Sequence, residues 1–480
     1  MNDALWFDPS LMLIGGEWRA AQATLPLTNP SDGSPLAQIA RGQAGDIDAA
    51  VSAAHAARAG DWGRMTATER GRILTEIGRT VLARVDDLAE IEAHDVGKPL
   101  TQARADAAAL ARYMEFYGGA ADKITGQTIP YLDGYTVYTL REPHGVTGHI
   151  VPWNYPMQII GRSVGAALAM GNACVLKPAE EACLTALAFA HICRDAGLPD
   201  GALNVVPGLG AEAGAALAGH ARVQHISFTG SVRTGALVQE AAGANVVPVT
   251  LELGGKSPQI VFDDADLDAA LPFLVNAGIQ NAGQTCSASS RILVQRGAYD
   301  AVRERMADAY AALSVGPAMD DLRVGPLIST RQQQIVNDFL AQGADLTIAA
   351  QGHLKNAPEH GAYVVPTLFA DVPPDHVLAR DEIFGPVQVL IPFDTEEEAI
   401  AIANSTDYGL VASVWTAHGA RQMRLARALH AGQVFINNYG AGGGVELPFG
   451  GVGKSGHGRE KGFEALYGFS TLKTVAAHHG

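Results

Sequence analysis

The chain has 480 residues, of which 48% are hydrophobic and 18% are charged, with a formal net charge of −16 and a pI of about 5.3. This length is enough for two or three domains with a large core. An acidic chain without a run of lysine and arginine is not expected to bind nucleic acid or an anionic membrane.

The chain contains four cysteines, too few for a disulfide framework. Cys174, Cys183 and Cys193 are spaced unlike the ligands of a zinc site, so we expect free thiols and no bound metal. No basic segment leads into an apolar run near the start, and no apolar run reaches the length of a membrane span. We therefore expect a cytoplasmic protein without a membrane segment.

The first part of the chain predicts scaffold helices. Apolar residues recur with helical spacing from Asp46 to Ala59, with Asp46 as the expected N-cap. The sequence from Thr66 to Glu69 is typical of a capping box before a second helix. A third helix is predicted over Thr101–Tyr117.

A hairpin is predicted next, with strands over Gln127–Leu132 and Tyr135–Arg141 joined by Asp133-Gly134. Its tyrosines suggest an arm that pairs with another subunit. A simple surface hairpin is an equally good interpretation.

Strand and helix patterns then alternate, which predicts parallel sheets covered by helices on both faces. In the first series, strands are predicted at 146–151, 173–176, 202–206, 224–228 and 247–251, and helices begin near Pro156, Leu184, Ala211 and Ser231. In the second series, strands are predicted at 259–261, 291–294, 346–349, 387–390, 411–415 and 434–436, and helices at 269–280, 299–313, 396–404 and 420–429. Gly254-Gly255 is a natural hinge between the two series, and the chain ends with a strand over Phe469–Ala476.

The polar turn Asn281-Ala-Gly-Gln-Thr-Cys286 holds one cysteine after a predicted helix. Cys286 is a candidate nucleophile if its pKa is lowered or a base lies nearby. Taken alone, a cysteine in such a segment is usually a small buried hydrophobe.

Two further side chains follow predicted strands. Asn154 could stabilise an oxyanion with its amide, or it could cap the next helix. Glu252, beside Gly254-Gly255, could act as a base if burial raises its pKa, or it could be a charge exposed on the turn.

Several loops are suited to a nucleotide. In Lys177-Pro-Ala-Glu180 the acidic residue could accept hydrogen bonds from ribose hydroxyls, although both charges could simply be solvated. The segment Gly208-Leu-Gly210 meets only the permissive dinucleotide fingerprint, and Phe228–Gly235 is the better phosphate candidate. The loop from Pro448 to Gly456 resembles a P-loop but lacks its first glycine, so we reject triphosphatase chemistry.

Taken in order, these motifs resemble those of the NAD(P)-dependent aldehyde dehydrogenase superfamily, of the hydrolytic, non-acylating type. The set is Pro-Trp-Asn-Tyr-Pro, Lys-Pro-Ala-Glu, Phe-Thr-Gly-Ser, Leu-Glu-Leu-Gly-Gly-Lys, Gly-Gln-Thr-Cys, Glu-Ile-Phe-Gly-Pro and Pro-Phe-Gly-Gly, which spans about Gly15 to Val475. The resemblance implies that Cys286 is the nucleophile, Asn154 part of the oxyanion hole and Glu252 the base that activates water.

The resemblance also implies NAD as cofactor, with NADP possible, and a small-molecule aldehyde as substrate. The implied cofactor-binding residues are Ile150, Val151, Pro152, Trp153, Lys177, Ala179, Glu180, Gly210, Phe228, Gly230, Ser231, Leu253, Glu382 and Phe384. The implied substrate-binding residues are Tyr155, Arg162 and Phe449. The substrate tunnel is expected to include loops near Ser287–Ser289 and Tyr439–Glu446.

Arg162 bears on the choice of aldehyde. It resembles the arginine with which succinate-semialdehyde dehydrogenases hold a substrate carboxylate, but it could equally point at a neighbouring carboxylate. A second arginine often found in such enzymes is Gln280 here. Some members of the family have a lysine at the position of Ser163 and pair it with a glutamate, which corresponds to Glu460 here. Because the lysine is missing, a proton relay from it to Glu252 is in doubt.

The implied fold is α/β, with two doubly wound parallel-sheet domains and a small β arm for oligomerisation. The implied divisions are 1–121 and 144–254 for a Rossmann-like NAD-binding domain, 255–453 for the catalytic domain, and 122–143 and 465–480 for the arm. A homodimer or homotetramer is expected. An acylating enzyme and a non-catalytic protein on the same fold are alternatives, but neither explains why Glu252, Asn154 and Cys286 occur together.

Overall fold

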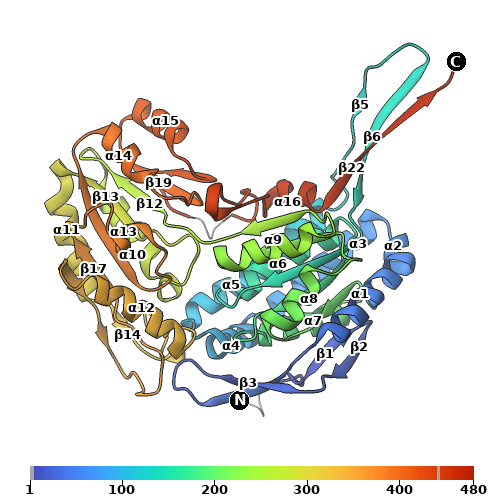
Figure 1. Ribbon diagram of the computed structural model, residues 1–480, viewed down its shortest axis with the longest axis horizontal. Helices are drawn as coiled ribbons and strands as arrows, with labels where there is room; N and C mark the ends of the chain where they lie inside the picture. The colour runs from blue at the N-terminus through green and yellow to red at the C-terminus, as the bar shows by residue number, and fades with distance from the viewer. Residues whose placement is uncertain (1–4, 441–443) are drawn as a thin grey trace.

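The computed structural model describes residues 5–440 and 444–480. It contains two large sheets flanked by helices and one projecting arm (Figure 1). The predicted α/β fold with two parallel-sheet units and a β arm is therefore confirmed.

The first sheet has a parallel centre and antiparallel edges. Its strands, in spatial order, are β2 (Glu17–Ala20), β1 (Leu11–Ile14), β9 (Leu203–Val205), β8 (Ala173–Pro178), β7 (Val146–Val151), β10 (His225–Thr229), β11 (Val249–Glu252) and β21 (Gly456–His457). The strands from β9 to β11 run parallel, whereas β1, β2 and β21 are antiparallel to their neighbours. Every residue of β7 and β8 is buried, as expected for central parallel strands.

The helices of this half are α1 (Ala44–Ala59), α2 (Asp61–Arg64), α3 (Ala67–Ala83), α4 (Val85–Val96), α5 (Leu100–Ala120), α6 (Pro156–Ala169), α7 (Leu184–Asp195), α8 (Ala215–Ala218) and α9 (Val232–Gly243). The capping box at Thr66 is confirmed, since its hydroxyl accepts from the Glu69 amide. The predicted N-cap of α1 is wrong. Gln43 occupies that position, and Asp46 lies one turn inside, where its carboxylate accepts from the Gln43 amide at 2.8 Å.

The second sheet is parallel except at one edge. Its strands, in spatial order, are β15 (Thr347–Gln351), β17 (Thr367–Ala370), β18 (Val387–Phe393), β13 (Arg291–Gln295), β12 (Pro258–Val261), β19 (Val411–Trp415) and β20 (Gln433–Ile436), with β15 antiparallel to β17. The remaining helices are α10 (Leu267–Ile279), α11 (Arg296–Ala311), α12 (Thr330–Gln342), α13 (Val377–Arg380), α14 (Glu396–Ala403), α15 (Gly419–Ala428) and α16 (Gly462–Gly468). Each large sheet has its own cluster of buried apolar side chains.

Two short pairs of strands lie outside the large sheets: β3 (Thr24–Thr28) with β4 (Pro35–Ala40), and β14 (Ser314–Val315) with β16 (His353–Leu354). None of the helices in the described part of the chain is long and apolar enough to cross a membrane.

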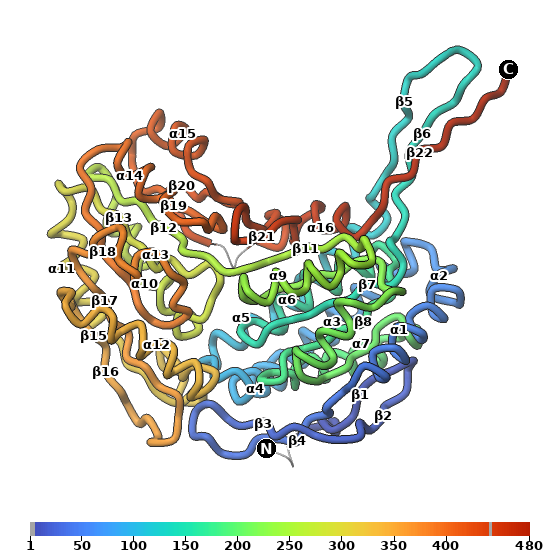
Figure 2. Tube along the Cα trace, viewed as in Figure 1, coloured from blue at the N-terminus to red at the C-terminus, as the bar shows by residue number. Residues whose placement is uncertain are grey.

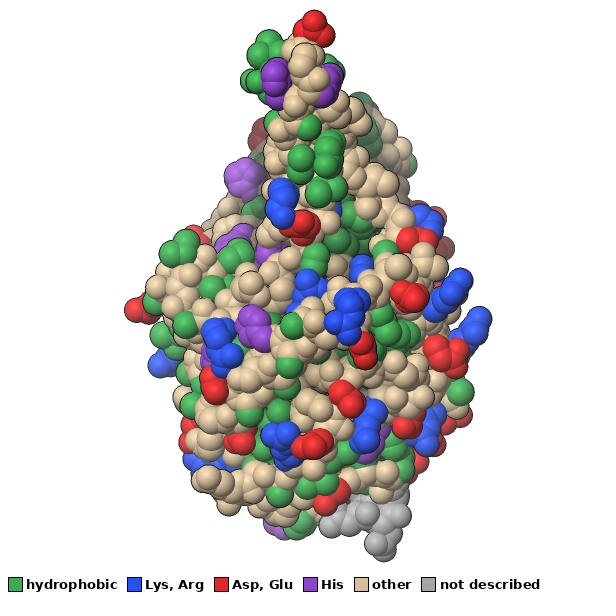
Figure 3. All heavy atoms as spheres, turned by 90° about the vertical axis from the view of Figure 1, so that its right-hand side faces the viewer, with side chains coloured by type: hydrophobic (Ala, Val, Ile, Leu, Met, Phe, Trp, Pro, Cys, Tyr) green, Lys and Arg blue, Asp and Glu red, His purple; other side chains and the backbone are tan. Residues whose placement is uncertain are grey.

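The arm consists of β5 (Thr128–Ile129), β6 (Tyr135–Pro143) and β22 (Ser470–His478), with β6 in the middle (Figure 2). The predicted hairpin and C-terminal strand therefore exist, although the first strand is shorter than expected. In the space-filling view, hydrophobic side chains are visible along the arm (Figure 3). Leu132 is 62% exposed and Leu472 is 56% exposed, which is unusual for leucine in a strand-rich segment.

Candidate active site

The turn that carries Cys286 is held in an uncommon backbone conformation. Asn281 and Ala282 both have positive φ, at 49° and 53°. Gly283 follows with φ of 75°, and a side chain there would overlap the backbone carbonyl of Gly385. Strained residues of this kind persist only where their surroundings fix them, and they are common at functional sites.

Side chains on this turn fix its position against the rest of the molecule. The Asn281 amide donates to the Asn154 carbonyl at 3.0 Å. The Gln284 side chain donates to the Asn281 carbonyl at 3.0 Å and accepts from the Ile328 amide at 2.9 Å. The loop is therefore a rigid platform for the cysteine that follows it.

Cys286 differs from the other three cysteines, because it is only partly buried whereas they are fully buried. Burial raises the pKa of the Cys286 thiol to about 11, and the nearby Arg162 guanidinium opposes that rise. The side chain is therefore accessible but mainly a thiol at neutral pH, and its activation depends on what binds beside it.

Cys286 lies at the junction of two cavities. One cavity, of about 50 Å³, also contains the predicted substrate residues Tyr155, Arg162 and Phe449. The other, of about 290 Å³, is lined by Pro152, Trp153, Gly230, Ser231, Glu382 and Phe384 among the predicted cofactor residues. Asn154, Thr229 and Cys286 line both cavities. A molecule in either cavity therefore lies beside Cys286.

Asn154 does not cap the helix that follows it, because Tyr155 occupies the N-cap position of α6. The Asn154 amide nitrogen instead donates to the Gln284 carbonyl at 3.0 Å. An amide group has a second N–H, and the residue lines both cavities at the cysteine. The amide is thus suited to donate to an oxyanion formed at Cys286.

Glu252 ends β11 and is 1% exposed, so it is not a charge on a surface turn. Neither carboxylate oxygen has a hydrogen-bond partner among the described residues. Burial raises the pKa of Glu252 well above its usual range, although Arg162 opposes the shift. A carboxylate with a raised pKa is suited to accept a proton near neutral pH.

Arg162 points at a neighbouring carboxylate, the second of its two predicted alternatives. Its guanidinium Nε forms an ion pair with Glu460, which also accepts from the Ser227 hydroxyl at 2.7 Å. The guanidinium carbon lies 4.9 Å from the centre of the Phe449 ring. Ser163 donates back to the Ile159 carbonyl within α6 at 2.8 Å, so it does not replace the missing lysine.

The larger of the two cavities fits a nicotinamide nucleotide. Glu382 accepts from the Gly255 amide at 3.1 Å, and burial raises the pKa of its carboxyl group to about 7. Trp153 and Phe384 meet edge to face, with ring centres 5.3 Å apart. Gly230 packs closely against the Phe228 ring, since a Cβ there would lie 2.6 Å from it. Gly230 and Ser231 line this cavity just before the N-terminus of α9, where backbone N–H groups favour an anion.

The residues predicted to hold the adenosine form a second group. Glu180 accepts from Lys177 at 2.7 Å and from the Gly210 amide at 3.2 Å. These two contacts fix the position of the carboxylate, and an acidic side chain at such a loop is suited to accept from ribose hydroxyls. Five other predicted cofactor residues are largely buried: Ile150, Val151, Ala179, Phe228 and Leu253.

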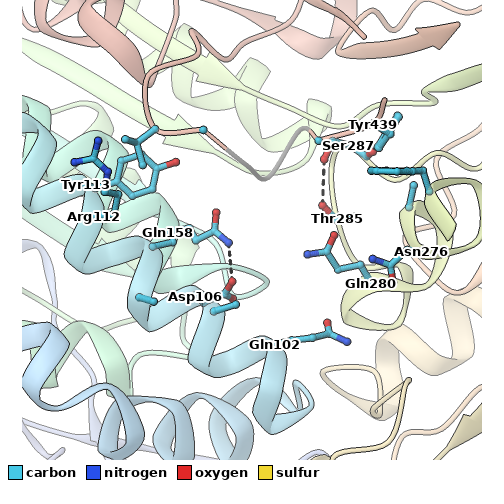
Figure 4. Close-up of a pocket in the computed structure, with 18 of the residues that line it drawn as sticks. Gln102, Asp106, Arg112, Tyr113, Gln158, Asn276, Gln280, Thr285, Ser287 and Tyr439 are labelled. Atoms are coloured by element: carbon cyan, nitrogen blue, oxygen red, sulfur yellow. Dashed lines mark hydrogen bonds between the residues drawn. The ribbon is translucent and has the colours of Figure 1, made fainter. Parts of the chain in front are cut away.

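A wider cavity of about 640 Å³ shares Gln158, Gln280, Thr285 and Ser287 with the smaller substrate cavity. Figure 4 shows its two walls, with Gln102, Asp106 and Tyr113 of α5 facing Asn276 and Gln280. Gln158 donates to Asp106 at 2.6 Å on the first wall. Of the loop predicted over Tyr439–Glu446, residues 441–443 lie outside the described part of the chain.

Four residues that line the inner cavity were not predicted: Gln158, Ile159, Thr229 and Lys461. Thr229 lies within the Phe-Thr-Gly motif, so its neighbours gave a signal for it. Lys461 follows Glu460 directly, but one lysine in a glycine-rich tail gives no signal by itself.

This fold and this site define an oxidoreductase with a nucleotide cavity and a substrate cavity on either side of one cysteine. The aldehyde dehydrogenase family model matches residues 18–475. The chain belongs to the aldehyde dehydrogenase family and is an enzyme that oxidises aldehydes with NAD(P).

Similar proteins include a Burkholderia cenocepacia protein, provisionally assigned to the aldehyde dehydrogenases, whose crystal structure is 64% identical with a TM-score of 0.97 over 98% of this chain and 100% of that chain. An aldehyde dehydrogenase from Bacillus cereus in complex with NAD⁺ is 40% identical, with a TM-score of 0.96 over 100% of this chain and 98% of that chain. A hydroxyisobutyraldehyde dehydrogenase from Mycolicibacterium austroafricanum is 40% identical over 97% of this chain and 93% of the relative.

Proposed function

We propose that the protein oxidises an aldehyde to a carboxylic acid with a preference for NAD, through a thioester on Cys286 that water hydrolyses. The observation that carries the proposal is the position of Cys286 between the two cavities, with Asn154 shared by both. This arrangement supports a reaction in which a nucleophile, an oxyanion donor and a bound nucleotide act on one carbon.

Each residue has a defined part in this reaction. The Cys286 thiolate attacks the aldehyde carbon and forms a thiohemiacetal, whose oxyanion accepts from the Asn154 amide. NAD bound in the larger cavity supplies the hydride acceptor. Glu252 takes a proton from water, which then attacks the thioester carbonyl and releases the acid. Because Glu252 is present and buried, hydrolysis is a better match than transfer to coenzyme A.

The preference for NAD is supported by Glu180. Its carboxylate lies where the adenosine ribose is expected, and it accepts from Lys177 and Gly210. A 2′-phosphate at this ribose would meet that negative charge.

The test is NADH formation with a panel of an uncharged aliphatic aldehyde, a benzaldehyde and succinate semialdehyde, for wild type and Cys286→Ala. We expect wild type to oxidise at least one of them and the variant to lose at least about 1,000-fold of kcat. Cys193→Ala is the matched control, because Cys193 is buried in the first core. Unchanged activity of Cys286→Ala would show that the thioester route is wrong.

A second candidate is a succinate-semialdehyde-type enzyme in which Arg162 binds the substrate carboxylate. Arg162 lines the substrate cavity, which supports this candidate. Its ion pair with Glu460 counts against it, because the guanidinium charge is already matched. The variant Arg162→Ala distinguishes the two candidate functions. A selective loss of succinate semialdehyde oxidation supports the second candidate, and an equal loss for all aldehydes supports a structural role.

We also propose that residues 1–121 and 144–254 form the NAD-binding domain, 255–453 the catalytic domain, and 122–143 with 465–480 an arm that joins subunits into a dimer or tetramer in the cytoplasm. The exposed apolar residues of the arm support the assembly. Light scattering of Leu472→Asp tests it, since a charge in a buried contact should dissociate the assembly. An unchanged mass would count against the arm as the interface.

A further inference from the structure

A buried carboxylate orients the amide group of one side chain in the substrate cavities. Gln158 of α6 lines both the inner cavity, together with Cys286, and the wide cavity outside it. Its Nε2 donates to the Asp106 carboxylate at 2.6 Å. An ionised carboxylate can only accept hydrogen bonds, so the NH2 group of the glutamine has to face Asp106 and its amide oxygen has to face away. Figure 4 shows this oxygen on the side away from Asp106, in the space between the two walls.

A buried lysine fixes the carboxylate of Asp106 in turn. Asp106 is itself buried and forms an ion pair with Lys98, which is fully buried. Lys98 also pairs with Glu92 at 2.9 Å, and its ammonium nitrogen lies 4.0 Å from the centre of the Tyr155 ring. Tyr155 lines the inner cavity. The buried charges therefore support two side chains of that cavity, Tyr155 by direct contact with Lys98 and Gln158 through Asp106.

The amide oxygen of Gln158 is available to a ligand. Within residues 5–440 and 444–480, no group donates a hydrogen bond to this oxygen. The charged residues in the described lining of the wide cavity are Asp106, Arg112 and Glu446. Arg112 donates to Glu446 at 2.6 Å, and Asp106 is paired with Lys98, so these charges are matched within the protein. A neutral hydroxyl group can donate to the Gln158 oxygen, whereas a methyl group or a carboxylate leaves it unpaired.

We propose that Gln158 is a specificity-determining residue whose amide oxygen accepts a hydrogen bond from a substrate hydroxyl, so that the enzyme acts on a neutral hydroxyaldehyde. Asp106 is the positioning residue that keeps this oxygen turned into the cavity. This assignment rests on the proposed function and names a substrate class for it. Gln280, Thr285 and Ser287 line both cavities and offer further polar contacts to such a substrate. Because the two cavities are continuous through these residues, aldehydes of different chain length can be accommodated.

The test compares hydroxyaldehydes with aldehydes of the same shape in which a methyl group replaces the hydroxyl. The pairs are glycolaldehyde with propanal, lactaldehyde with 2-methylpropanal, and 3-hydroxypropanal with butanal. We expect wild type to prefer the hydroxyl member of at least one pair by at least about tenfold in kcat/KM, as for one hydrogen bond to an otherwise unpaired acceptor. Gln158→Met keeps the length of the side chain but removes the acceptor, so this preference should fall at least about fivefold.

Two further variants separate the oriented oxygen from general polarity. In Asp106→Asn the new amide can donate to the Gln158 oxygen, which then turns away from the cavity, so the preference should fall although Gln158 is unchanged. Glu92 still pairs with Lys98 in this variant, so the lysine charge stays matched. Gln280→Met removes an amide from the opposite wall of the same cavities and should change the preference by less than about twofold. A merely structural effect of any variant would lower both members of a pair alike, and equal losses of preference in Gln158→Met and Gln280→Met would overturn the inference.

A second readout does not depend on turnover. Without NAD, the Cys286 thiol adds reversibly across the aldehyde C=O bond, with its proton passing to the oxygen, and this protects the sulfur from iodoacetamide. The half-protecting concentration of the hydroxyl member should be at least about fivefold lower than that of its methyl partner in wild type, and equal to it in Gln158→Met. No preference in wild type, or one that persists in Gln158→Met, would overturn the inference and leave the proposed function intact. If wild type oxidises no aldehyde but the protection behaves as expected, the proposed function fails and the hydroxyl site is supported.

Discussion

The guanidinium of Arg162 and the carboxylate of Glu460 form an ion pair in which both side chains are buried. The pair lies beside Glu252, the proposed base, whose pKa is raised by burial, lowered by Arg162 and raised further by Glu460. The two charges therefore act on the base in opposite directions, and removal of either one alone leaves an uncompensated charge next to it.

We expect Arg162→Met to reduce the free energy of unfolding by about 3–5 kcal/mol, because it leaves Glu460 buried without its partner. The double variant Arg162→Met/Glu460→Gln should recover part of this loss, since no unpaired charge remains. Urea denaturation of wild type, Arg162→Met, Glu460→Gln and the double variant measures the coupling free energy between the two side chains. Strictly additive losses would show that the pair does not stabilise the fold.

We expect the rate at which Cys286 is alkylated to depend steeply on pH. Since burial raises its pKa to about 11, the thiolate fraction of the free enzyme should increase about tenfold for each pH unit between 8 and 10. The measurement is the rate of inactivation by iodoacetamide, with Cys286→Ser as the background and glutathione as a freely exposed thiol. A rate that levels off below pH 8 would contradict a raised pKa.

Glu252→Gln should stop the reaction at the thioester. The amide cannot take a proton from water, so about one NADH per site should form rapidly and steady turnover should fall by at least about 100-fold. Mass spectrometry should detect the acyl group on Cys286. Glu240→Gln, an exposed change on α9, is the control. Wild-type turnover should also fall at acid pH, because Glu252 becomes protonated. Normal turnover of Glu252→Gln would exclude this residue as the base.

The central elements could be predicted because their local signals agree. β7 is buried along its whole length and contains four β-branched residues, which favour a strand, and Pro156 marks the start of α6. β1 and β2 were not predicted, because strands of only four residues are too short to show a clear periodic pattern. α12 and β17 were not predicted either. In α12 only Val336 is fully buried, so its sequence shows little apolar periodicity.

The candidate site was predicted less completely than the fold. Cys286, Asn154 and Glu252 each lie within a recognisable motif. The ion pair of Arg162 with Glu460 joins residues far apart in the sequence, so only the fold shows which of the two alternatives for Arg162 holds. The backbone of Lys461 was also beyond prediction, because the sequence favours a glycine at such φ and ψ values.

Glu180→Ser should shift the cofactor preference. It removes the carboxylate that accepts from Lys177 and Gly210, and leaves Lys177 free to bind a 2′-phosphate. We expect the ratio of kcat/KM for NADP over NAD to increase at least about tenfold, a change equivalent to about 1.4 kcal/mol. Glu181→Ser, at the exposed neighbouring position, is the matched control. An unchanged ratio would show that Glu180 does not read the ribose.

Val246 gives a test of backbone strain away from the site. Its φ is 56°, and the side chain is 90% exposed just after α9. The left-handed conformation costs a β-branched residue about 1–2 kcal/mol, and the exposed side chain returns little packing energy. The flexibility of glycine in the unfolded chain offsets part of this cost. Val246→Gly should therefore raise the free energy of unfolding by about 0.5–1 kcal/mol and leave turnover unchanged. Val247→Gly is the matched control, because Val247 packs against the core without positive φ and its loss should destabilise the protein. Equal effects of the two substitutions, measured by urea denaturation, would show that strain at Val246 is not the cause.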